Sequence, residues 1–333
     1  MKSASATIRD VAQAADVSVA SVSRALNGHS NVHPDTRARV LAAVKALGYV
    51  PHAGARSLSL ARSHAIGVVL PDLHGEFFSE IVRGMDREVG ARGYHLLLSN
   101  MHADAELAAQ AMRSMRGRVD GLIVMAPQLD AERLHEALPG DVPAVLVNSL
   151  DGAGRAGFRI ANAEGIGTMV AHLAATGRRH LVHVAGPSGN IDARERCEGF
   201  LAAMGTHAPG IEPIVIEGDF REDSGATAVA TLRARGVRFD GIVAANDMMA
   251  LGVLAALREQ GMAVPGAVAV TGFDDIPLAR YLGLTTMRVP LAEMGARAVA
   301  RLIDALEGGS LSPETQVVAT DLVIRTTTEA VSP

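Results

Sequence analysis

Residue types that define special classes of protein are scarce in this chain, and their scarcity excludes several classes. The 333 residues include one cysteine, Cys197, and no tryptophan. A lone cysteine can form neither an internal disulfide nor a cysteine-based zinc cluster, so we expect no metal and a reducing compartment. No apolar run reaches the roughly 18 residues that span a bilayer, and the opening MKSASATIRD carries charges where a secretory signal would be apolar. We therefore expect no membrane contact and a cytoplasmic location.

Motifs that define common enzymes are also missing. The sequence contains no Gly-x-Ser-x-Gly elbow, no Walker loop and no zinc-type histidine cluster. Gly152, Gly154 and Gly157 match the G-x-G-x-x-G of nicotinamide-binding proteins. The FRIANAEG that follows resembles a short strand and a turn rather than a helix start, so no helix N-terminus would face a pyrophosphate. We expect neither enzyme activity nor a cofactor, with a nicotinamide-dependent oxidoreductase kept as an alternative.

Charge is distributed unevenly along the chain, although the net charge is only −5. Residues 1–63 carry eight lysines and arginines against three aspartates, whereas the remainder carries 23 basic and 33 acidic residues. A small basic unit joined to a larger acidic one indicates that the first part faces a polyanion. At about 100–200 residues per domain, the length predicts two or three units.

Two short helices are predicted at the start of the basic region. Thr7 precedes an apolar-periodic stretch and Asp10 follows three residues later, a capping-box pattern that predicts a helix over residues 8–14. Ser18 can cap a second helix over residues 19–26. The first two helices are thus joined by a tight turn.

A third helix is predicted between Pro34 and Gly48, because proline favours the first helical position and glycine the residue after the last. Its apolar stripe comprises Val40, Val44 and Leu47. Three short helices, the first two joined by a tight turn, are typical of a helix-turn-helix module. We expect this domain to occupy residues 1–50.

The strings TIRDVAQAADVSVASVSRALNG and VHPDTRARVLAAVKALGYVPHAGARSL closely resemble the DNA-binding head of the lactose/galactose repressor family, and the resemblance covers nearly the whole chain. It implies a transcriptional regulator, more often a repressor, that binds double-stranded DNA at a palindromic operator. It also implies a homodimer and a small-molecule effector, a sugar or sugar derivative, that changes operator affinity. Asp16 stands where glycine is commoner in the family, but aspartate tolerates a left-handed backbone.

The resemblance places the DNA-reading residues at the start of the second helix. Val19 and Ala20 take base-reading positions, where apolar side chains can touch a thymine methyl but cannot hydrogen-bond a base. Arg24 is the strongest candidate for a guanine contact. Further candidates for backbone or mixed contacts are Thr7, Ser18, Ser21, Ser23, Asn27 and Thr36. For each serine, a solvated helix hydroxyl remains the alternative.

Residues 51–63, PHAGARSLSLARS, have small side chains and a central Gly54, so a helix here should be marginal when alone. The segment is similar to the family's hinge helix. By that resemblance, Leu58 wedges into the minor groove at the operator centre, with Ala55 and Arg56 beside it. A plain linker is the alternative.

From residue 64 to residue 333 the pattern changes, and by the resemblance this part is the effector-binding and dimerisation domain. Eight apolar runs, AIGVVLPD, YHLLLSN, GLIVMAP, PAVLVNS, HLVHVAGP, EPIVIEGD, GIVAAND and VAVTGFDD, alternate with helical stretches. This alternation predicts an α/β body of two doubly wound parallel-sheet subdomains, similar to periplasmic binding proteins. The chain is expected to cross between them near residues 158–163 and 288–292. A sugar-binding protein without DNA binding is thus a second alternative, which the basic head opposes.

Ligands of open α/β sheets bind beyond the carboxyl ends of the strands, and polar residues gather there in this chain. By resemblance, the inducer cleft is lined at Arg196, Phe220, Asn246 and Asp274, with Asp192 at a contact position. Phe77 and Phe78, which follow the first strand, and Asn190 complete the predicted effector site. Purine-responsive relatives carry arginine and threonine where this chain has Asn190 and Asp192, which favours a polyol or sugar.

Two apolar helix faces are candidates for the dimer interface, although either could equally belong to the core. One contains Ile81, Val82, Met85 and Val89, and the other spans Leu251–Leu257. Ala161, in IANAEG, replaces an acid that is usual in the family, so one expected pocket or cap carboxylate is missing.

Overall fold

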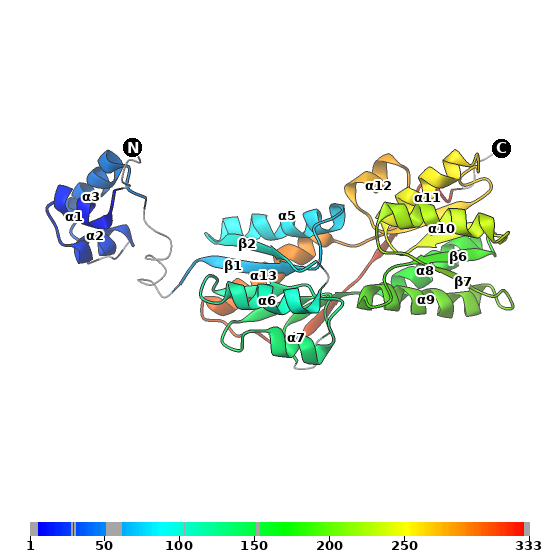
Figure 1. Ribbon diagram of the computed structural model, residues 1–333, viewed down its shortest axis with the longest axis horizontal. Coiled ribbons are helices and arrows are strands. Elements are labelled where there is room, and N and C mark those ends of the chain that lie inside the picture. Colours follow the sequence, from blue (N-terminus) through cyan, green and yellow to red (C-terminus); the bar gives the residue numbers. More distant parts are fainter. Residues whose placement is uncertain are drawn as a thin grey trace. The chain divides into compact units, whose positions relative to one another are not determined.

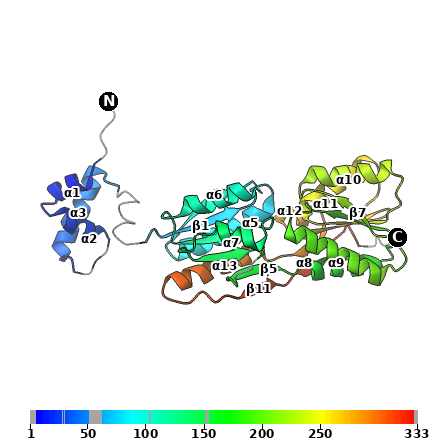
Figure 2. The same ribbon diagram turned by 60° about the horizontal axis from the view of Figure 1, so that its bottom comes forward.

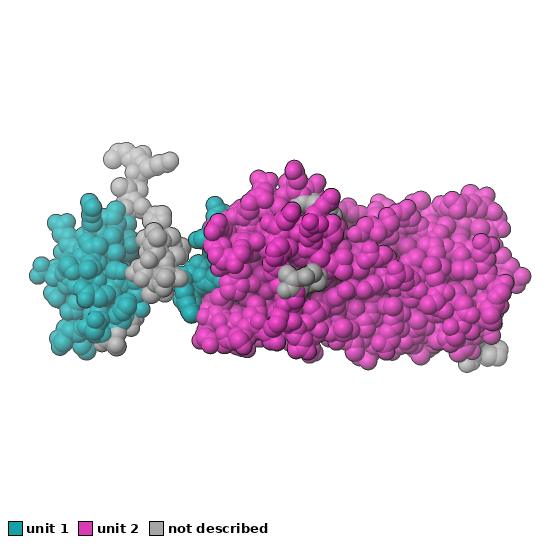
Figure 3. Space-filling view, turned by 90° about the horizontal axis from the view of Figure 1, so that it is seen from below, with its two compact units in different colours: residues 1–65, 117–120 teal, residues 66–116, 121–333 magenta. Residues whose placement is uncertain are grey.

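The computed structural model describes residues 6–27, 29, 31–50, 62–102, 104–150 and 154–329. The chain forms two compact units, one of residues 1–65 with 117–120 and one of residues 66–116 with 121–333 (Figure 3). The predicted hinge residues Ala55, Arg56 and Leu58 lie outside the described residues.

The described part of the first unit contains three helices, α1 (Ile8–Ala14), α2 (Val19–Leu26) and α3 (Pro34–Leu47), as the sequence predicts (Figure 1). The capping box is confirmed, because the Asp10 N–H donates to Thr7 and the Thr7 N–H donates to Asp10. The Ser21 N–H donates to the Ser18 hydroxyl at 3.1 Å, so Ser18 caps α2.

Residues with a left-handed backbone form the turn between α1 and α2 and end α3. Asp16 adopts the left-handed conformation with φ of 50°, and so does Gly48 with φ of 59°. After Gly48, the Tyr49 N–H donates to the Val44 carbonyl at 3.1 Å, a Schellman arrangement that folds Tyr49 onto the core. The prediction that Leu47 belongs to the buried stripe is wrong. It is the last residue of α3 and is 40% exposed, while the inward face is completed by Val40, Ala43 and Val44.

The described part of the second unit holds two six-stranded sheets, of which sheet A has the order β11-β5-β4-β3-β1-β2. Its strands are β1 (Ala65–Leu70), β2 (His95–Asn100), β3 (Gly121–Val124), β4 (Ala144–Val147), β5 (Gly157–Ile160) and β11 (Thr315–Val318). Helices α5 (Glu76–Ala91) and α13 (Leu291–Leu306) pack on each other, as do α6 (Ala105–Met115) and α7 (Ala131–Ala137) (Figure 1). Right-handed crossovers place these two pairs on opposite faces of the sheet.

Sheet B has the order β12-β10-β9-β8-β6-β7. Its strands are β6 (Leu181–Ala185), β7 (Ile214–Glu217), β8 (Gly241–Ala244), β9 (Ala269–Asp274), β10 (Thr285–Arg288) and β12 (Asp321–Val323). Helix α8 (Asn162–Ala175) packs on α9 (Ile191–His207), and α10 (Glu222–Ala234) packs on α11 (Asp247–Glu259) (Figure 2). The short helix α12 (Pro277–Tyr281) follows β9. The predicted parallel sheets are confirmed except at β12, which runs antiparallel to β10.

The chain passes between the two sheets at the two predicted places, after β5 and after β10. A third passage, between β11 and β12, is not predicted by the sequence. The prediction of a turn after the short strand in FRIANAEG is wrong, because α8 begins directly at Asn162. The segment is a strand followed at once by a helix, since the chain leaves sheet A there and enters the other subdomain.

Much of the two helix faces considered for dimerisation belongs to the core. Ile81, Met85 and Val89 are buried on α5, where they join the core cluster that includes α13. Val253 and Leu257 are likewise buried on α11. The apolar periodicity of these helices therefore reports packing within the chain.

Candidate functional sites

The start of α2 presents apolar side chains to solvent. Val19 is 42% exposed, and Ala20 beside it is also exposed. Arg24, one turn later, is exposed, and its Nε donates to the Ala20 carbonyl at 3.3 Å. These residues form an exposed surface, and by the resemblance they remain the predicted DNA-reading positions.

The hydroxyl groups predicted to contact DNA also have local partners. The Thr7 N–H and the Thr7 hydroxyl donate to Asp10 Oδ2 at 2.7 and 2.8 Å, and these two bonds, the first more than the second, lower the pKa of Asp10. The Ser18 and Ser21 hydroxyls are 2.9 Å apart. The remaining predicted residues, half-buried on or beside α2 and α3, are Ser23, Asn27 and Thr36. Thr7 and Ser18 therefore cap their helices, so a DNA contact would be an additional role for these two residues.

Arg37 shows that a basic residue of the head can be structural. Its Nη1 donates to the Ala25 carbonyl at 2.9 Å and its Nη2 to the His29 carbonyl at 2.5 Å. These carbonyls lie at and after the end of α2, where helix carbonyls lack intrahelical partners. Arg37 therefore ties α3 to the end of α2.

In the second unit, a cavity of about 160 Å³ lies beyond the carboxyl ends of strands from both sheets. All eight residues predicted to contact an effector line it: Phe77, Phe78, Asn190, Asp192, Arg196, Phe220, Asn246 and Asp274. Other lining residues include Asp72, His74, Met125, Pro127, Asp219, Arg221 and Met248. The volume is below the 300–1,000 Å³ usual for drug-sized ligands, so a small ligand fits best.

The buried Arg196, on α9, forms one wall of the cavity. Its Nε donates to Asn162 Oδ1 at 2.8 Å and its Nη1 to the Ala245 carbonyl at 2.5 Å. The guanidinium carbon lies 3.9 Å from the centre of the Phe273 ring, a cation–π contact. These contacts fix the guanidinium plane, so its position does not depend on a ligand.

Asp274, at the end of β9, faces Arg196 without a good hydrogen bond. Its Oδ1 lies 3.5 Å from Arg196 Nη2 and accepts no hydrogen bond from the described residues. Burial raises the pKa of Asp274 to about 7, with Arg196 opposing the rise and Asp192 adding to it. A buried acceptor without a donor is a place for a ligand or a water molecule.

Two further buried carboxyl groups lie close to Asp274. Burial raises the pKa of Asp192, whose Oδ1 accepts from Asn162 Nδ2 at 2.8 Å. Burial and the nearby Asp274 raise the pKa of Asp247 well above its ordinary value. Asp247 accepts from the Thr286 hydroxyl at 2.6 Å, which holds it behind the cavity wall.

The two asparagines of the predicted site cap helices. Asn190 Oδ1 accepts from the N–H groups of Asp192 and Ala193 at 2.9 and 3.1 Å, at the start of α9. Asn246 Oδ1 accepts from the Met249 N–H at 2.9 Å, at the start of α11. Their presence in the cavity thus has a structural cause as well.

Three phenylalanines supply the apolar surface. Phe77 and Phe78 lie in the first turn of α5, with ring centroids 5.1 Å apart and edge to face, and both also pack on the core. Phe220 has a left-handed φ of 69°, and its carbonyl accepts from Asn246 Nδ2 at 2.9 Å. A Cβ on Gly186 would stand 2.4 Å from the Phe220 ring, so any larger residue there would have to displace the ring.

The sequence did not predict the pairs that join the two subdomains at the cavity. Arg221 Nη2 donates to Asp72 Oδ2 at 3.0 Å, and His74 Nε2 lies 3.1 Å from Glu222 Oε2. Asp72 ends the first apolar run, which marks it as a strand-end residue. Its partner is 149 positions away, and no local pattern identifies it.

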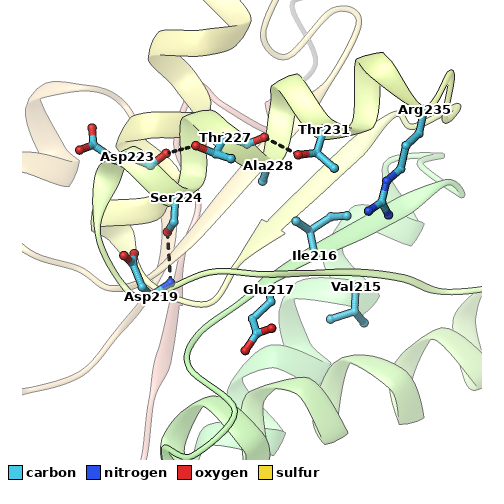
Figure 4. Close-up of a pocket in the computed structure, with 10 residues that line it drawn as sticks. All are labelled: Val215, Ile216, Glu217, Asp219, Asp223, Ser224, Thr227, Ala228, Thr231 and Arg235. Atoms are coloured by element: carbon cyan, nitrogen blue, oxygen red, sulfur yellow. Dashed lines mark hydrogen bonds between the residues drawn. The ribbon is translucent and has the colours of Figure 1, made fainter.

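A second hollow lies between β7 and α10 (Figure 4). The hydroxyls along α10 bond within their own helix: Thr227 donates to the Asp223 carbonyl at 2.8 Å and Thr231 to the Thr227 carbonyl at 2.9 Å. None of the predicted effector residues lines this hollow. The cavity between the sheets is therefore the better candidate site.

Ala161 precedes α8 without a side-chain hydrogen bond, so the acid that the family usually has there is indeed missing from the helix start. The adjacent Asn162 is buried and bonds both Asp192 and Arg196. It couples the start of α8 to the cavity wall. Within the described part of the chain, no helix is long and apolar enough to cross a membrane.

The family models and the known proteins that match this chain agree with one another. Residues 7–52 match the family model "Bacterial regulatory proteins, lacI family", and residues 170–328 match "Periplasmic binding protein-like domain". The chain is 31% identical to the ribose operon repressor of Halalkalibacterium halodurans, over 97% of each chain. It is 32% identical to the transcriptional regulator GalR of Salmonella typhimurium, over 96% of this chain and 95% of that protein.

Solved structures show the same fold. The Lac repressor dimer bound to operator and an anti-inducer matches with a TM-score of 0.88 at 30% identity, covering 98% of this chain and all of that one. A complex of the transcriptional regulator CelR with cellobiose matches with a TM-score of 0.70 at 29% identity, covering 97% of this chain and 99% of that one.

Proposed function

This chain belongs to the lacI family of bacterial regulatory proteins and is a DNA-binding transcriptional regulator rather than an enzyme, and we propose that it is a sugar-responsive repressor. It binds a palindromic operator as a homodimer in the cytoplasm. A sugar or sugar derivative in the cavity between the sheets changes its operator affinity. The observation that carries the effector part is the meeting of all eight predicted residues around one cavity.

DNA recognition rests on α2. Its N-terminal residues Val19 and Ala20 meet base edges, where they contact thymine methyl groups and exclude polar groups. Arg24 donates to a guanine, which requires it to leave its weak 3.3 Å bond to the helix backbone. The hydroxyls around both caps hold phosphates and set the position of the head.

The domain division is residues 1–50 for DNA binding, 51–63 for the hinge and 64–333 for effector binding and dimerisation. In the hinge, Leu58 enters the minor groove, with Ala55 and Arg56 beside it. Two weak heads on one dimeric body gain affinity through their effective concentration, and the two-fold axis matches a palindrome.

The dimer surface includes α12 and the residue after it. Leu278, Tyr281 and Leu282 are 38%, 73% and 46% exposed, three apolar residues within one short segment. Contiguous exposed apolar residues mark interaction sites. Because the Lac repressor that this chain resembles is a dimer, a second copy of this chain is the partner that covers them.

Coupling follows from the position of the cavity between the subdomains. A ligand that contacts Phe77 on one side and Arg196 on the other favours one relative position of the subdomains. A movement of one subdomain relative to the other changes the distance between Asp72 and Arg221, so their ion pair breaks or tightens. If the hinge segments of the two protomers can pair in only one of these subdomain positions, a ligand that favours another position shifts the population away from the DNA-bound form.

Selection of duplexes from a random pool by the full-length protein tests this function, at fixed salt because phosphate contacts make affinity salt-dependent. We expect enrichment of a palindrome with a deformable centre. An Arg24→Gln variant selected in parallel should lose the preference at one symmetric pair of positions, whereas Arg39→Gln, an exposed change on α3, should keep it. Enrichment of a sequence without two-fold symmetry would contradict a dimeric operator-binding protein.

A further inference from the structure

We propose that the effector carries no anionic group: the cavity is built for an uncharged polyhydroxylated ligand and rejects phosphate esters and sugar acids. This inference rests on the proposed function, because it describes the ligand of the same cavity. It rests on the charged groups that line the cavity, on the partners that these groups already have, and on Asp274 Oδ1, a buried acceptor without a hydrogen bond from the described residues.

Acidic side chains outnumber basic ones around the cavity. The lining acids are Asp72, Asp192, Asp219 and Asp274, against the two guanidinium groups of Arg196 and Arg221 and the imidazole of His74. Asp192 and Asp274 are 7% and 3% exposed, so water screens them poorly. An anionic ligand would therefore enter a site where carboxyl groups already outnumber basic groups.

Both arginines are committed to partners in the protein. Arg196 donates to Asn162 and to the Ala245 carbonyl and turns its remaining edge toward Asp274. Arg221 donates to Asp72 at 3.0 Å. A phosphate group that bound either guanidinium would therefore lie beside the carboxyl group that already pairs with it.

The helix N-termini at the cavity, which are the other usual anion sites, are also occupied. Asn190 takes the N–H groups at the start of α9, and Asp192 places a carboxylate in that same first turn. Asn246 takes an N–H at the start of α11. At the start of α5, Glu76 already supplies a negative charge, and its Oε2 accepts from the Leu278 N–H at 3.0 Å. An anion would meet a carboxylate at the first and last of these helix starts.

The open polar group fits a hydroxyl and not an anion. Asp274 Oδ1 is buried in the wall, accepts no hydrogen bond from the described part of the chain and lies 3.5 Å from Arg196 Nη2. A ligand hydroxyl placed there donates to the carboxylate and accepts from the guanidinium, satisfying both. An ionised phosphate or carboxylate oxygen can only accept, so it could bond Asp274 only if that carboxyl group were protonated.

The protonation behaviour of the wall agrees with this geometry. Burial raises the pKa of Asp274 to about 7, and that of Asp192 is raised by the same cause. A second anion in the cavity would raise both further, so an anionic ligand would bind only with uptake of protons. A neutral ligand needs no such uptake and replaces water with hydroxyls against the rings of Phe77, Phe78 and Phe220.

Matched pairs of ligands test the proposal on the full-length protein. Galactose, glucose, ribose and fructose are compared with galactose 1-phosphate, glucose 6-phosphate, ribose 5-phosphate and fructose 1-phosphate, first by thermal shift and then by calorimetry. Inorganic phosphate at matched ionic strength serves as an anion probe that does not depend on the sugar. We expect the sugar that binds to exceed its ester at least tenfold in affinity, and phosphate to give no saturable stabilisation.

One substitution tests the effect of the cavity's charge separately from that of its shape. Asp72→Asn releases Arg221 for an anion and removes one negative charge. The ratio of sugar affinity to ester affinity should therefore fall several-fold in this variant. Asp223→Asn, on α10 in the hollow outside this cavity, should leave the preference unchanged. Tighter binding of any ester than of its parent, or saturable binding of phosphate, would overturn the proposal. Failure of the proposed function is distinct, because it shows as the absence of a selected palindrome in an assay without ligand.

Discussion

Replacing Asp274 by asparagine should make the protein more stable at alkaline pH while impairing its response to effector. Asp274 is 3% exposed, and burial raises its pKa from an ordinary 3.8 to about 7. The folded protein therefore holds a proton on this group that the unfolded chain releases. As pH rises from 4 to 8, the folded state loses stability relative to the unfolded state, since its carboxyl group ionises with greater difficulty.

The size of this effect follows from the two pKa values. Each tenfold difference in proton affinity corresponds to about 1.4 kcal/mol, so a rise from 3.8 to about 7 costs about 4 kcal/mol at pH 8. At pH 4 the same relation gives less than about 1 kcal/mol. Asparagine has nearly the shape of the protonated carboxyl group and cannot ionise. The free energy of unfolding of the Asp274→Asn variant should therefore exceed that of the unchanged protein by these amounts.

Urea unfolding of the second unit at pH 4, 6 and 8 measures the difference, followed by calorimetry with the effector at pH 8. Asp275→Asn is the matched control at the next position. Its carboxylate bonds Arg288 and Arg325, both at 2.7 Å, so its loss should destabilise the protein. A destabilised Asp274→Asn protein at pH 8, or a gain in stability that does not change with pH, would refute this account of the cavity wall.

Three further predictions concern single contacts. Arg24→Gln should weaken operator binding about tenfold or more in a gel-shift titration, because a bidentate guanine contact contributes about 1–3 kcal/mol of discrimination, and an equal loss on unrelated DNA would exclude a base contact. Gly186→Ala should displace the Phe220 ring and lower effector affinity at least tenfold by calorimetry while operator binding without effector persists; unchanged affinity would place that ring outside the site. Thr7→Ala should destabilise α1 by about 1 kcal/mol, seen as faster amide exchange at its first turn, and unchanged exchange would show that the capping box is dispensable.

The head could be predicted from sequence because its signals are local. Thr7 with Asp10, Ser18, Pro34 and Gly48 each fix one helix end through contacts a few residues away. The exposure of Leu47 was not predictable from periodicity, since it depends on where α3 ends against the other two helices.

The body was predicted only in part for a physical reason. Long apolar runs such as β1 are visible because they are buried on both faces, whereas β11 (TQVV) and β12 (DLV) are short, partly exposed edge strands. The strand ends and the resemblance to the repressor family together identified residues that line the cavity. The pairing of Asp72 with Arg221 depends on the approach of two subdomains, which no local pattern encodes.

Reciprocal coupling tests the central claim most directly, because a ligand that lowers operator affinity must itself bind less tightly to the operator complex by the same factor. Calorimetric titration of the effector into the full-length protein, with and without the selected operator, gives both affinities. We predict a lower effector affinity on the operator, by the same factor by which saturating effector weakens DNA binding. Identical effector affinity in both titrations would contradict the account, since the cavity and the DNA-binding head would then be uncoupled.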